Sequence, residues 1–368
     1  MTKKVVLISL AFIISGCEYF DDYDKYNNQN IKEKKYKIIS IDDDFDANSK
    51  NDAQYYYRYN KDGYISKIEY DYLLDGVIDL VYSYSYNTDK LLSKVAIDYN
   101  ADGKYDLVYN YKYNQKRLEK VEYDYNNDGH IDYTYSYKYN AKGLVSSYKI
   151  ESTIKGITII SDFKDDIFNK SKYFCDFGVC LDFIKFPTNA PESFGKVPYT
   201  SASVSSIYSS TLSKGDIEYI YKYNDNNQLS SISIDKNIDN IIDVIYNYKY
   251  NDKYLLATIG IDYDANGVDD YSMRYSYNQN NLVEKLAIDY YNNDTIDIEY
   301  NYTYDSKNLL EKFSVNYANT DKVDSIFLYN YNDKNLLTSI DQDYNNDSKI
   351  DRSVKYNYMP FENGEFQP

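Results

Sequence analysis

The chain has 368 residues, of which 51 are tyrosines and none is tryptophan, and its formal net charge is -17. Such an acidic chain argues against nucleic acids and anionic lipid headgroups as partners. Tyrosine is a strand former with an apolar ring, so the composition indicates an all-β protein and not a disordered acidic tail.

Residues 1–16 are predicted to be a secretion signal, with two lysines near the start and an apolar core at 5–14 that is too short to span a bilayer. The next segment, Ile14-Ser15-Gly16-Cys17, resembles the bacterial lipobox, in which the cysteine is diacylated and becomes the mature N-terminus. This resemblance implies a lipoprotein anchored through Cys17. Glu18 replaces the aspartate that favours inner-membrane retention, which implies the outer membrane, on its periplasmic or surface face. The alternative is an ordinary signal peptide with an incidental cysteine.

Residues 17–36 are polar and are expected to form a tether. A unit of about 27 residues then recurs, in a first array at 37–150 and a second at 220–358, before a tail at 359–368. The period is marked by single tyrosines: Tyr59, Tyr86, Tyr113 and Tyr139, then Tyr223, Tyr250, Tyr277, Tyr304, Tyr331 and Tyr358. A fixed period of this length is the signature of a repeat architecture.

Each unit is predicted to be a β-hairpin. Alternate residues of the outgoing strand share a face, with Tyr109, Tyr111 and Tyr113 on one side and Val108, Asn110 and Lys112 on the other. This period of two is typical of a half-buried antiparallel sheet, and no segment shows a helical period. We expect the tyrosine face to be the core; the alternative is a sugar-binding platform.

The turn between hairpins, as in Tyr57-Arg58-Tyr59-Asn60-Lys61-Asp62-Gly63-Tyr64-Ile65, resembles the YD repeat of RHS-type proteins, Y-x-Y-D-x-x-G-x-L, with asparagine for aspartate. YD repeats build a continuous sheet that curls into a spiral or shell. The resemblance therefore implies about ten antiparallel hairpins in a curved or spiralling sheet. The alternative is a β-propeller, in which ten hairpins make five four-stranded blades.

A nine-residue acidic loop joins the two strands of each hairpin. Six loops have oxygen-bearing side chains at positions 1, 3, 5 and 9: Asp44, Asp46, Asn48, Asp52; Asp98, Asn100, Asp102, Asp106; Asp124, Asn126, Asp128, Asp132; Asp235, Asn237, Asp239, Asp243; Asp262, Asp264, Asn266, Asp270; and Asp343, Asn345, Asp347, Asp351. Calcium takes six to eight such oxygens, and glycine at position 6 permits the turn. We therefore expect calcium at these loops, with dissociation constants of about 10⁻⁴–10⁻³ M.

The loop at 98–107, D-x-N-x-D-G-x-x-D-L, resembles the calcium loops of FG-GAP propeller repeats and of thrombospondin-type repeats, and lacks the position-12 glutamate of an EF-hand. In two further loops Leu73 and Tyr291 replace the position-3 ligand. The loops at 208–216 and 316–324 are degenerate and are expected to be empty. The alternative for all of them is a metal-free hairpin turn, which does not account for the recurrent aspartates at positions 1 and 9.

The array is interrupted at 151–219 by an irregular insert. Its Cys175 and Cys180 are predicted to form a small disulfide in an oxidising compartment; the alternative is two free thiols. Long inserts often carry function, so we expect contact with an unidentified protein or polysaccharide partner here. The alternative is a tolerated excursion without a role.

The sequence lacks a recognisable catalytic constellation. Its single histidine, His130, lies at position 7 of an acidic loop, and it has no G-x-S-x-G motif and no phosphate-binding glycine loop. We therefore expect a non-catalytic, lipid-anchored, calcium-stabilised envelope protein that serves as a binding or structural module. The alternative is a polysaccharide-binding protein or a polysaccharide-acting enzyme with a carboxylate pair near the insert.

Overall fold

A computed structural model describes residues 35–152, 217–317, 322–362 and 365–366. Over these ranges the chain forms 21 strands and no helix, and thus none long and apolar enough to cross a membrane. The strands are β1 (Lys35–Asp44), β2 (Ala53–Tyr59), β3 (Ile65–Asp71), β4 (Leu80–Tyr86), β5 (Leu92–Asp98), β6 (Leu107–Asn114), β7 (Arg117–Tyr125), β8 (Tyr133–Tyr139), β9 (Val145–Ser152), β10 (Ile217–Tyr223), β11 (Leu229–Lys236), β12 (Val244–Tyr250), β13 (Leu256–Asp262), β14 (Tyr271–Tyr277), β15 (Val283–Asp289), β16 (Ile298–Tyr304), β17 (Leu310–Tyr317), β18 (Ser325–Tyr331), β19 (Leu337–Asp343), β20 (Arg352–Glu362) and β21 (Glu365–Phe366).

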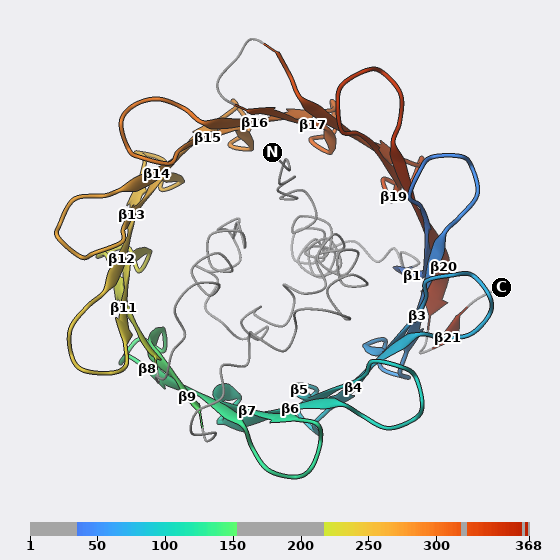
Figure 1. Ribbon diagram of the computed structural model, residues 1–368, viewed down its shortest axis with the longest axis horizontal. Helices are drawn as coiled ribbons and strands as arrows, with labels where there is room; N and C mark the ends of the chain where they lie inside the picture. Colours follow the sequence, from blue (N-terminus) through green and yellow to red (C-terminus); the bar gives the residue numbers. More distant parts are fainter. Residues whose placement is uncertain (1–34, 153–216, 318–321, 363–364, 367–368) are drawn as a thin grey trace, which may run out of the picture.

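The first twenty strands close into one antiparallel barrel (Figure 1). Each strand pairs with its predecessor and its successor, and β1 pairs with β20 over nine residue pairs, from Lys35↔Phe361 to Asp44↔Ser353. The two arrays lie in the same sheet because β9 pairs with β10, as in Tyr219↔Tyr148. The short strand β21 extends the sheet beside β20.

The all-β array of ten antiparallel hairpins is confirmed, but the expected spiral sheet and the alternative propeller are both wrong. Successive hairpins pair with each other as well as internally, so no separate blades exist among the described strands. The sheet meets its own beginning at β1 and β20, which removes the exposed edges that a spiral would leave at both ends.

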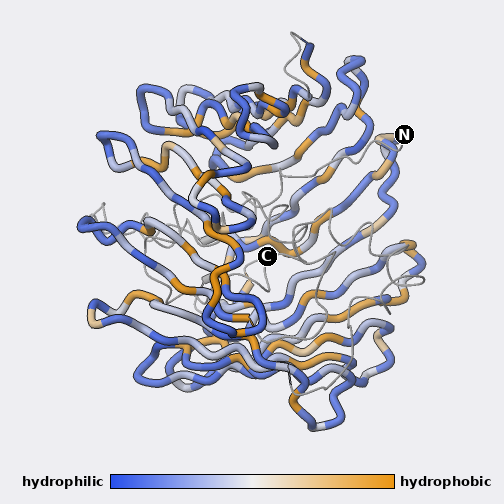
Figure 2. The backbone as a smooth tube through the Cα atoms, turned by 60° about the vertical axis from the view of Figure 1, so that its left-hand side comes forward, coloured by the Kyte–Doolittle hydropathy of each residue, from blue (hydrophilic) through white to orange (hydrophobic). Residues whose placement is uncertain are grey.

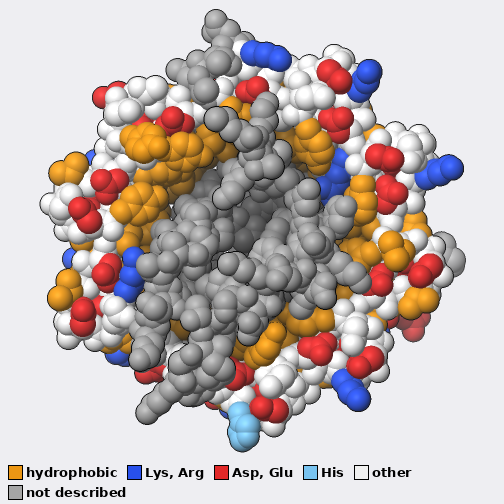
Figure 3. Space-filling view, viewed as in Figure 1, with side chains coloured by type: hydrophobic (Ala, Val, Ile, Leu, Met, Phe, Trp, Pro, Cys, Tyr) orange, Lys and Arg blue, Asp and Glu red, His pale blue; other side chains and the backbone are white. Residues whose placement is uncertain are grey.

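The tyrosine face of the sheet lines the inside of the ring. Figure 3 shows hydrophobic side chains along the inner edge and many charged side chains towards the periphery, and Figure 2 shows hydrophilic loops at the strand ends. Core residues such as Tyr82, Ile97 and Tyr300 are almost completely buried. The outer face carries ion pairs between neighbouring strands, such as Lys112–Glu122 and Lys285–Glu299.

Nine of the ten tyrosines that mark the repeats make the same hydrogen bond. Each hydroxyl donates a hydrogen bond to a main-chain carbonyl on the preceding strand, over distances of 2.6 to 3.0 Å. These pairs are Tyr59–Ile38, Tyr86–Ile65, Tyr113–Leu92, Tyr139–Leu118, Tyr223–Val145, Tyr250–Leu229, Tyr277–Leu256, Tyr304–Val283 and Tyr331–Leu310. The Tyr223–Val145 bond joins β10 to β9, so the same bond recurs across the interruption in the sequence.

Two kinds of connection alternate around the barrel. Short turns join even-numbered strands to the next odd-numbered ones, and an Asn or Asp side chain organises several of them. Asn60, for example, accepts hydrogen bonds from the backbone N–H groups of Asp62 and Tyr64. Gly63 at the end of this turn has φ +84°, which explains why the repeat motif favours glycine there.

Candidate metal-binding loops

The acidic loops occupy one rim of the barrel. Every one of them joins an odd-numbered strand to the following even-numbered strand, and antiparallel pairing places all such connections at the same end. They splay outward from the ring in Figure 1. The sequence repeat therefore becomes a circle of acidic loops, with the short turns at the opposite rim.

The loop at 98–106 shows how the backbone and the acidic side chains fit together. The Asp98 carboxylate accepts hydrogen bonds from the N–H groups of Asp102 at 3.1 Å and Gly103 at 2.9 Å. Asp106 accepts one from the Tyr99 N–H at 2.7 Å, which ties the end of the loop to its beginning. The side chains at positions 1 and 9 thus hold the loop closed, and their remaining lone pairs can accept a further ligand.

The same bonds recur in the other five predicted loops. The position-1 aspartates are all buried because two backbone N–H groups from positions 5 and 6 cover each carboxylate: Asp44, Asp98, Asp124, Asp235, Asp262 and Asp343. The position-9 aspartates all bind the N–H of position 2: Asp52, Asp106, Asp132, Asp243, Asp270 and Asp351.

The predicted role of glycine at position 6 is confirmed. Gly103, Gly129 and Gly267 have φ between +88° and +92°, the left-handed region that glycine adopts without a steric penalty. Ser348 occupies the same position at φ +72°, where a side chain is strained. The residue at position 4 also has a left-handed backbone, as at Ala101 with φ +52°, and no glycine in the repeat motif marks this second strained position.

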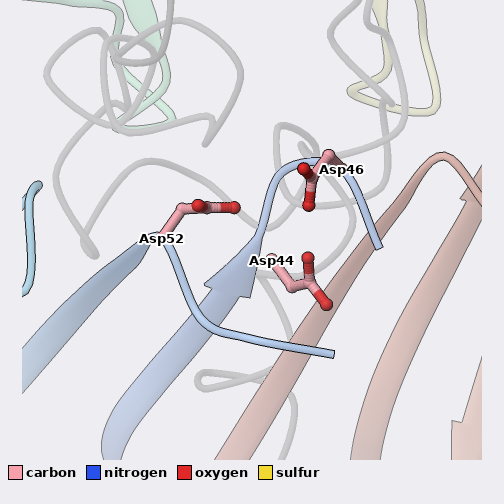
Figure 4. Close-up of side chains that lie close together, drawn as sticks. All are labelled: Asp44, Asp46 and Asp52. Carbon is pink, nitrogen blue, oxygen red and sulfur yellow. The ribbon is translucent and has the colours of Figure 1, made fainter. Parts of the chain in front are cut away.

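In two loops the acidic side chains converge. Carboxylate oxygens of Asp44, Asp46 and Asp52 lie within 4.8 Å of one another (Figure 4), and those of Asp262, Asp264 and Asp270 do the same. Both loops have aspartate at positions 1, 3 and 9. Among the described residues the other four loops, which have asparagine at position 3, show no such triple of carboxylates. The structure therefore distinguishes two loops that the sequence pattern treated as equal to the rest.

The loops with a lost position-3 ligand keep the fold of the complete ones. Around Leu73, Asp79 still accepts a hydrogen bond from the Tyr72 N–H at 2.8 Å, and the leucine side chain lies exposed at 76%. In the loop at 289–297, an arginine side chain lies beside the acidic groups. The Arg274 guanidinium is 2.8 Å from the Asp294 carboxylate and 3.5 Å from that of Asp289.

Several predicted features lie wholly or partly outside the described residues. The degenerate loop at 208–216 lies outside them, as do Cys17, predicted to carry a lipid, and Cys175 and Cys180, predicted to form a disulfide. The loop at 316–324 is described only at its ends, where Asp324 accepts a hydrogen bond from the Tyr317 N–H at 2.8 Å.

Sequence reasoning missed a buried ion pair at the closing seam. Arg352 on β20 donates through Nε and one terminal nitrogen to both oxygens of Asp43 on β1, at 3.1 and 3.0 Å, and both residues are at most 3% exposed. Tyr55 donates a further bond to Asp43 at 3.2 Å. Burial raises the pKa of the Asp43 carboxyl, and Arg352 opposes that shift. The two residues are 309 positions apart, so no local pattern could have linked them.

Comparisons with known proteins show only distant likeness. No protein-family model matches the sequence, and no curated protein matches it. Among solved structures, TcdB2-TccC3 is 11% identical with a TM-score of 0.36; the alignment covers 86% of this chain and 16% of that one. Porin-like proteins from Bacteroides uniformis ATCC 8492 and Bacteroides vulgatus ATCC 8482 are 9% and 8% identical, with TM-scores of 0.33 and 0.29. They cover 87% and 88% of this chain and 97% and 99% of their own.

Proposed function

We propose that this chain is a calcium-stabilised β-barrel, held at the bacterial envelope by a lipid on Cys17, that serves as a non-catalytic binding or structural module. The observation that supports it best is the convergence of Asp262, Asp264 and Asp270, with the matching triple at Asp44, Asp46 and Asp52. All the acidic loops lie at one rim of the barrel, so ions bound to them would stabilise that rim.

The converging loops fit a calcium ion in size and chemistry. Two oxygens bound to the same calcium ion lie at most about 5 Å apart, because each calcium–oxygen distance is about 2.3–2.6 Å. The carboxylate oxygens of each triple lie within 4.8 Å of one another, close enough together to bind one such ion. Three carboxylates at such distances repel one another in the absence of a cation. Hydrogen bonds from the backbone N–H groups of Asn266 and Gly267 hold Asp262 in position for the ion.

The outer face supports a lipid anchor in preference to an embedded barrel. A strand that faces lipid presents an outward apolar band, with polar residues towards the lumen. Here the order is reversed, because ion pairs such as Lys67–Glu69 and Lys120–Glu122 lie on the outer face and the tyrosines of the core cluster lie on the inner one. Attachment through a diacylated Cys17 places such a barrel at the membrane surface. Cys17→Ser should release the protein from the membrane fraction, and a wild-type protein without acyl mass would contradict the anchor.

Calcium titration by calorimetry, combined with melting curves, tests the metal. With calcium near 1 mM and dissociation constants of about 10⁻⁴–10⁻³ M, each site stabilises the fold by roughly 0.4–1.4 kcal/mol. A chelator should therefore lower the melting temperature, and magnesium should restore little of it, since magnesium demands tighter octahedral geometry.

Matched variants in two loops show which loops produce the calcium-dependent rise in melting temperature. Asp264→Ala removes a member of a converging triple and should reduce the calcium-dependent rise in melting temperature. Asp75→Ala lies in the loop that already carries Leu73 and should leave that rise nearly unchanged. A melting curve that neither calcium nor chelator moves would show that these loops are only turns.

A further inference from the structure

Side chains join the short turns to one another at the rim opposite the acidic loops. Eight turns of five residues lie there, from Asn60–Tyr64 to Asn332–Leu336, in a group of two and a group of six. Neighbouring turns within these groups therefore meet at six joints. At five joints the third residue of one turn is bonded to the fourth residue of the next, over 2.6 to 3.2 Å: Asp62–Lys90, Lys142–Asn227, Lys253–Asn281, Asn280–Asn308 and Lys307–Asn335.

The sixth joint, between turns 224–228 and 251–255, lacks this bond. Its two positions hold Asn226 and Tyr254, and within the described chain no hydrogen bond joins their side chains. The Tyr254 ring is 63% exposed, and its backbone is left-handed, with φ +61°. Glycine or asparagine occupies the same position in six of the other seven turns, because these residues tolerate that conformation best. An aromatic ring is thus held in solvent where the pattern of the rim favours a small residue.

A groove lies at this open joint. Its volume is about 550 Å³, which falls in the range of about 300–1,000 Å³ that is typical of small-molecule sites. The equivalent groove between turns 305–309 and 332–336 has a volume of about 210 Å³, and there Lys307 is bonded to Asn335 at 2.8 Å. The joint without the bond therefore has the larger groove, of a size that can hold a ligand.

The lining of the larger groove combines one exposed ring with neutral polar groups. Amide and hydroxyl side chains lie beside Tyr254: Asn224, Asn226, Gln228, Ser230 and Asn251. The side chains of Asn226 and Ser230 make no hydrogen bond to another described residue, so both can bond a ligand. The charged residues of the lining are Lys249 and Asp252, whose charges cancel. The groove therefore favours a neutral, polar ligand.

This combination of groups matches the surface of a sugar ring. Amides and hydroxyls both donate and accept hydrogen bonds, as sugar hydroxyls do, and a tyrosine ring packs against apolar C–H groups such as those on a sugar face. An extended peptide, in contrast, commonly binds by adding a strand to an unpaired sheet edge. No such edge exists here, because β11 and β12 are each paired on both sides.

We propose that the groove between turns 224–228 and 251–255 binds a neutral saccharide, which stacks on Tyr254 and accepts or donates hydrogen bonds at Asn226 and Ser230. The proposal gives a ligand class to the binding module of the proposed function, and it rests on that function in this respect alone. The groove lies at the rim opposite the acidic loops and contains none of their residues, so it requires neither calcium nor the lipid anchor.

Saturation-transfer NMR on the intact protein tests for such a ligand. The probes are α- and β-linked oligosaccharides of glucose, galactose, mannose and N-acetylglucosamine, with a mixture of short neutral peptides as the second probe. At least one oligosaccharide should receive saturation, most strongly at the C–H protons of one sugar face, and the peptides should not. Saturation of none of the sugars, or of the peptides alone, would overturn the proposal.

Variants of the two grooves locate the bound sugar. Tyr254→Asn places the residue found in other turns at the fourth position, where Asn308 bonds Asn280. It should weaken binding in calorimetry by about tenfold or more without lowering the melting temperature, because the stacking ring is lost and the backbone strain is relieved. Tyr254→Phe keeps the ring and should retain most of the affinity. Asn335→Ala, the matched control, removes the partner of Lys307 at the smaller groove and should leave the affinity unchanged.

Two results with these variants would overturn the assignment of the groove. One is equal affinity of the wild type and the Tyr254→Asn variant, and the other is an equal loss of affinity in the Asn335→Ala variant. The calcium-dependent melting temperature and the acyl mass of Cys17 are measured separately. Failure of the saccharide site would therefore leave the calcium and lipid proposals standing, and their failure would leave the site standing.

Discussion

Replacing Arg352 by alanine should weaken the closure of the barrel. The change leaves the Asp43 carboxylate buried at 0% exposure without the two charge-assisted hydrogen bonds that Arg352 supplies, and only the Tyr55 hydroxyl at 3.2 Å remains. Removing one partner of a buried ion pair costs about 3–5 kcal/mol, because the other charge stays desolvated. We expect a loss of that size in the free energy of unfolding at pH 7, measured by urea denaturation.

The loss should depend on pH in a defined direction. Burial raises the pKa of Asp43, and without Arg352 the shift becomes larger. A group whose pKa is raised in the folded state contributes stability below its unfolded pKa, near 4, and loses it as pH rises through the folded value. The difference between the variant and the wild type should therefore shrink as pH falls from 7 towards 4.

Two controls separate this effect from a general loss of charge. Lys285→Ala removes the exposed partner of Glu299 and should cost no more than about 1 kcal/mol. The double variant Asp43→Asn, Arg352→Ala should recover part of the single-variant loss, because no charge then remains buried. An Arg352→Ala effect as small as that of Lys285→Ala, or one independent of pH, would show that the Asp43–Arg352 pair does not stabilise the closing seam.

Three further predictions follow from the repeat itself. Ser348→Gly should stabilise the protein by about 1 kcal/mol in urea denaturation, because Ser348 has φ +72°, and Gly103→Ser should have the opposite effect. Tyr113→Phe should cost about 1 kcal/mol through loss of its bond to the Leu92 carbonyl, whereas Tyr64→Phe, at an exposed ring, should cost under about 0.5 kcal/mol. Burial raises the pKa of Tyr113 to about 12, so the stability that its neutral hydroxyl contributes is complete below pH 10 and is lost as pH rises towards 12. Tyrosinate absorbance and circular dichroism should therefore change together between pH 10 and 12. Separate transitions in the two signals would contradict this prediction.

The repeating unit follows from local patterns in the amino-acid sequence. Alternation at Tyr109, Tyr111 and Tyr113 predicted the strand and its buried face, because side chains in a strand alternate with a period of two whatever lies around it. Aspartates at positions 1 and 9 and glycine at position 6 predicted the acidic loop, because hydrogen bonds within nine residues define its shape. These features depend only on residues close together in the sequence, so a short sequence pattern is enough to predict them.

Closure of the sheet into a ring, and the pairs of charges that this closure brings together, depend on the tertiary structure. Closure depends on the strand twist and pairing angle accumulated over twenty strands, and a pattern that repeats identically in a spiral and in a ring cannot distinguish them. Asp43 and Arg352 become partners only when β1 reaches β20, and Arg274 reaches Asp294 only through the register of β14 and β15. Local sequence specifies each hairpin, but the sum of small rotations between hairpins specifies the barrel.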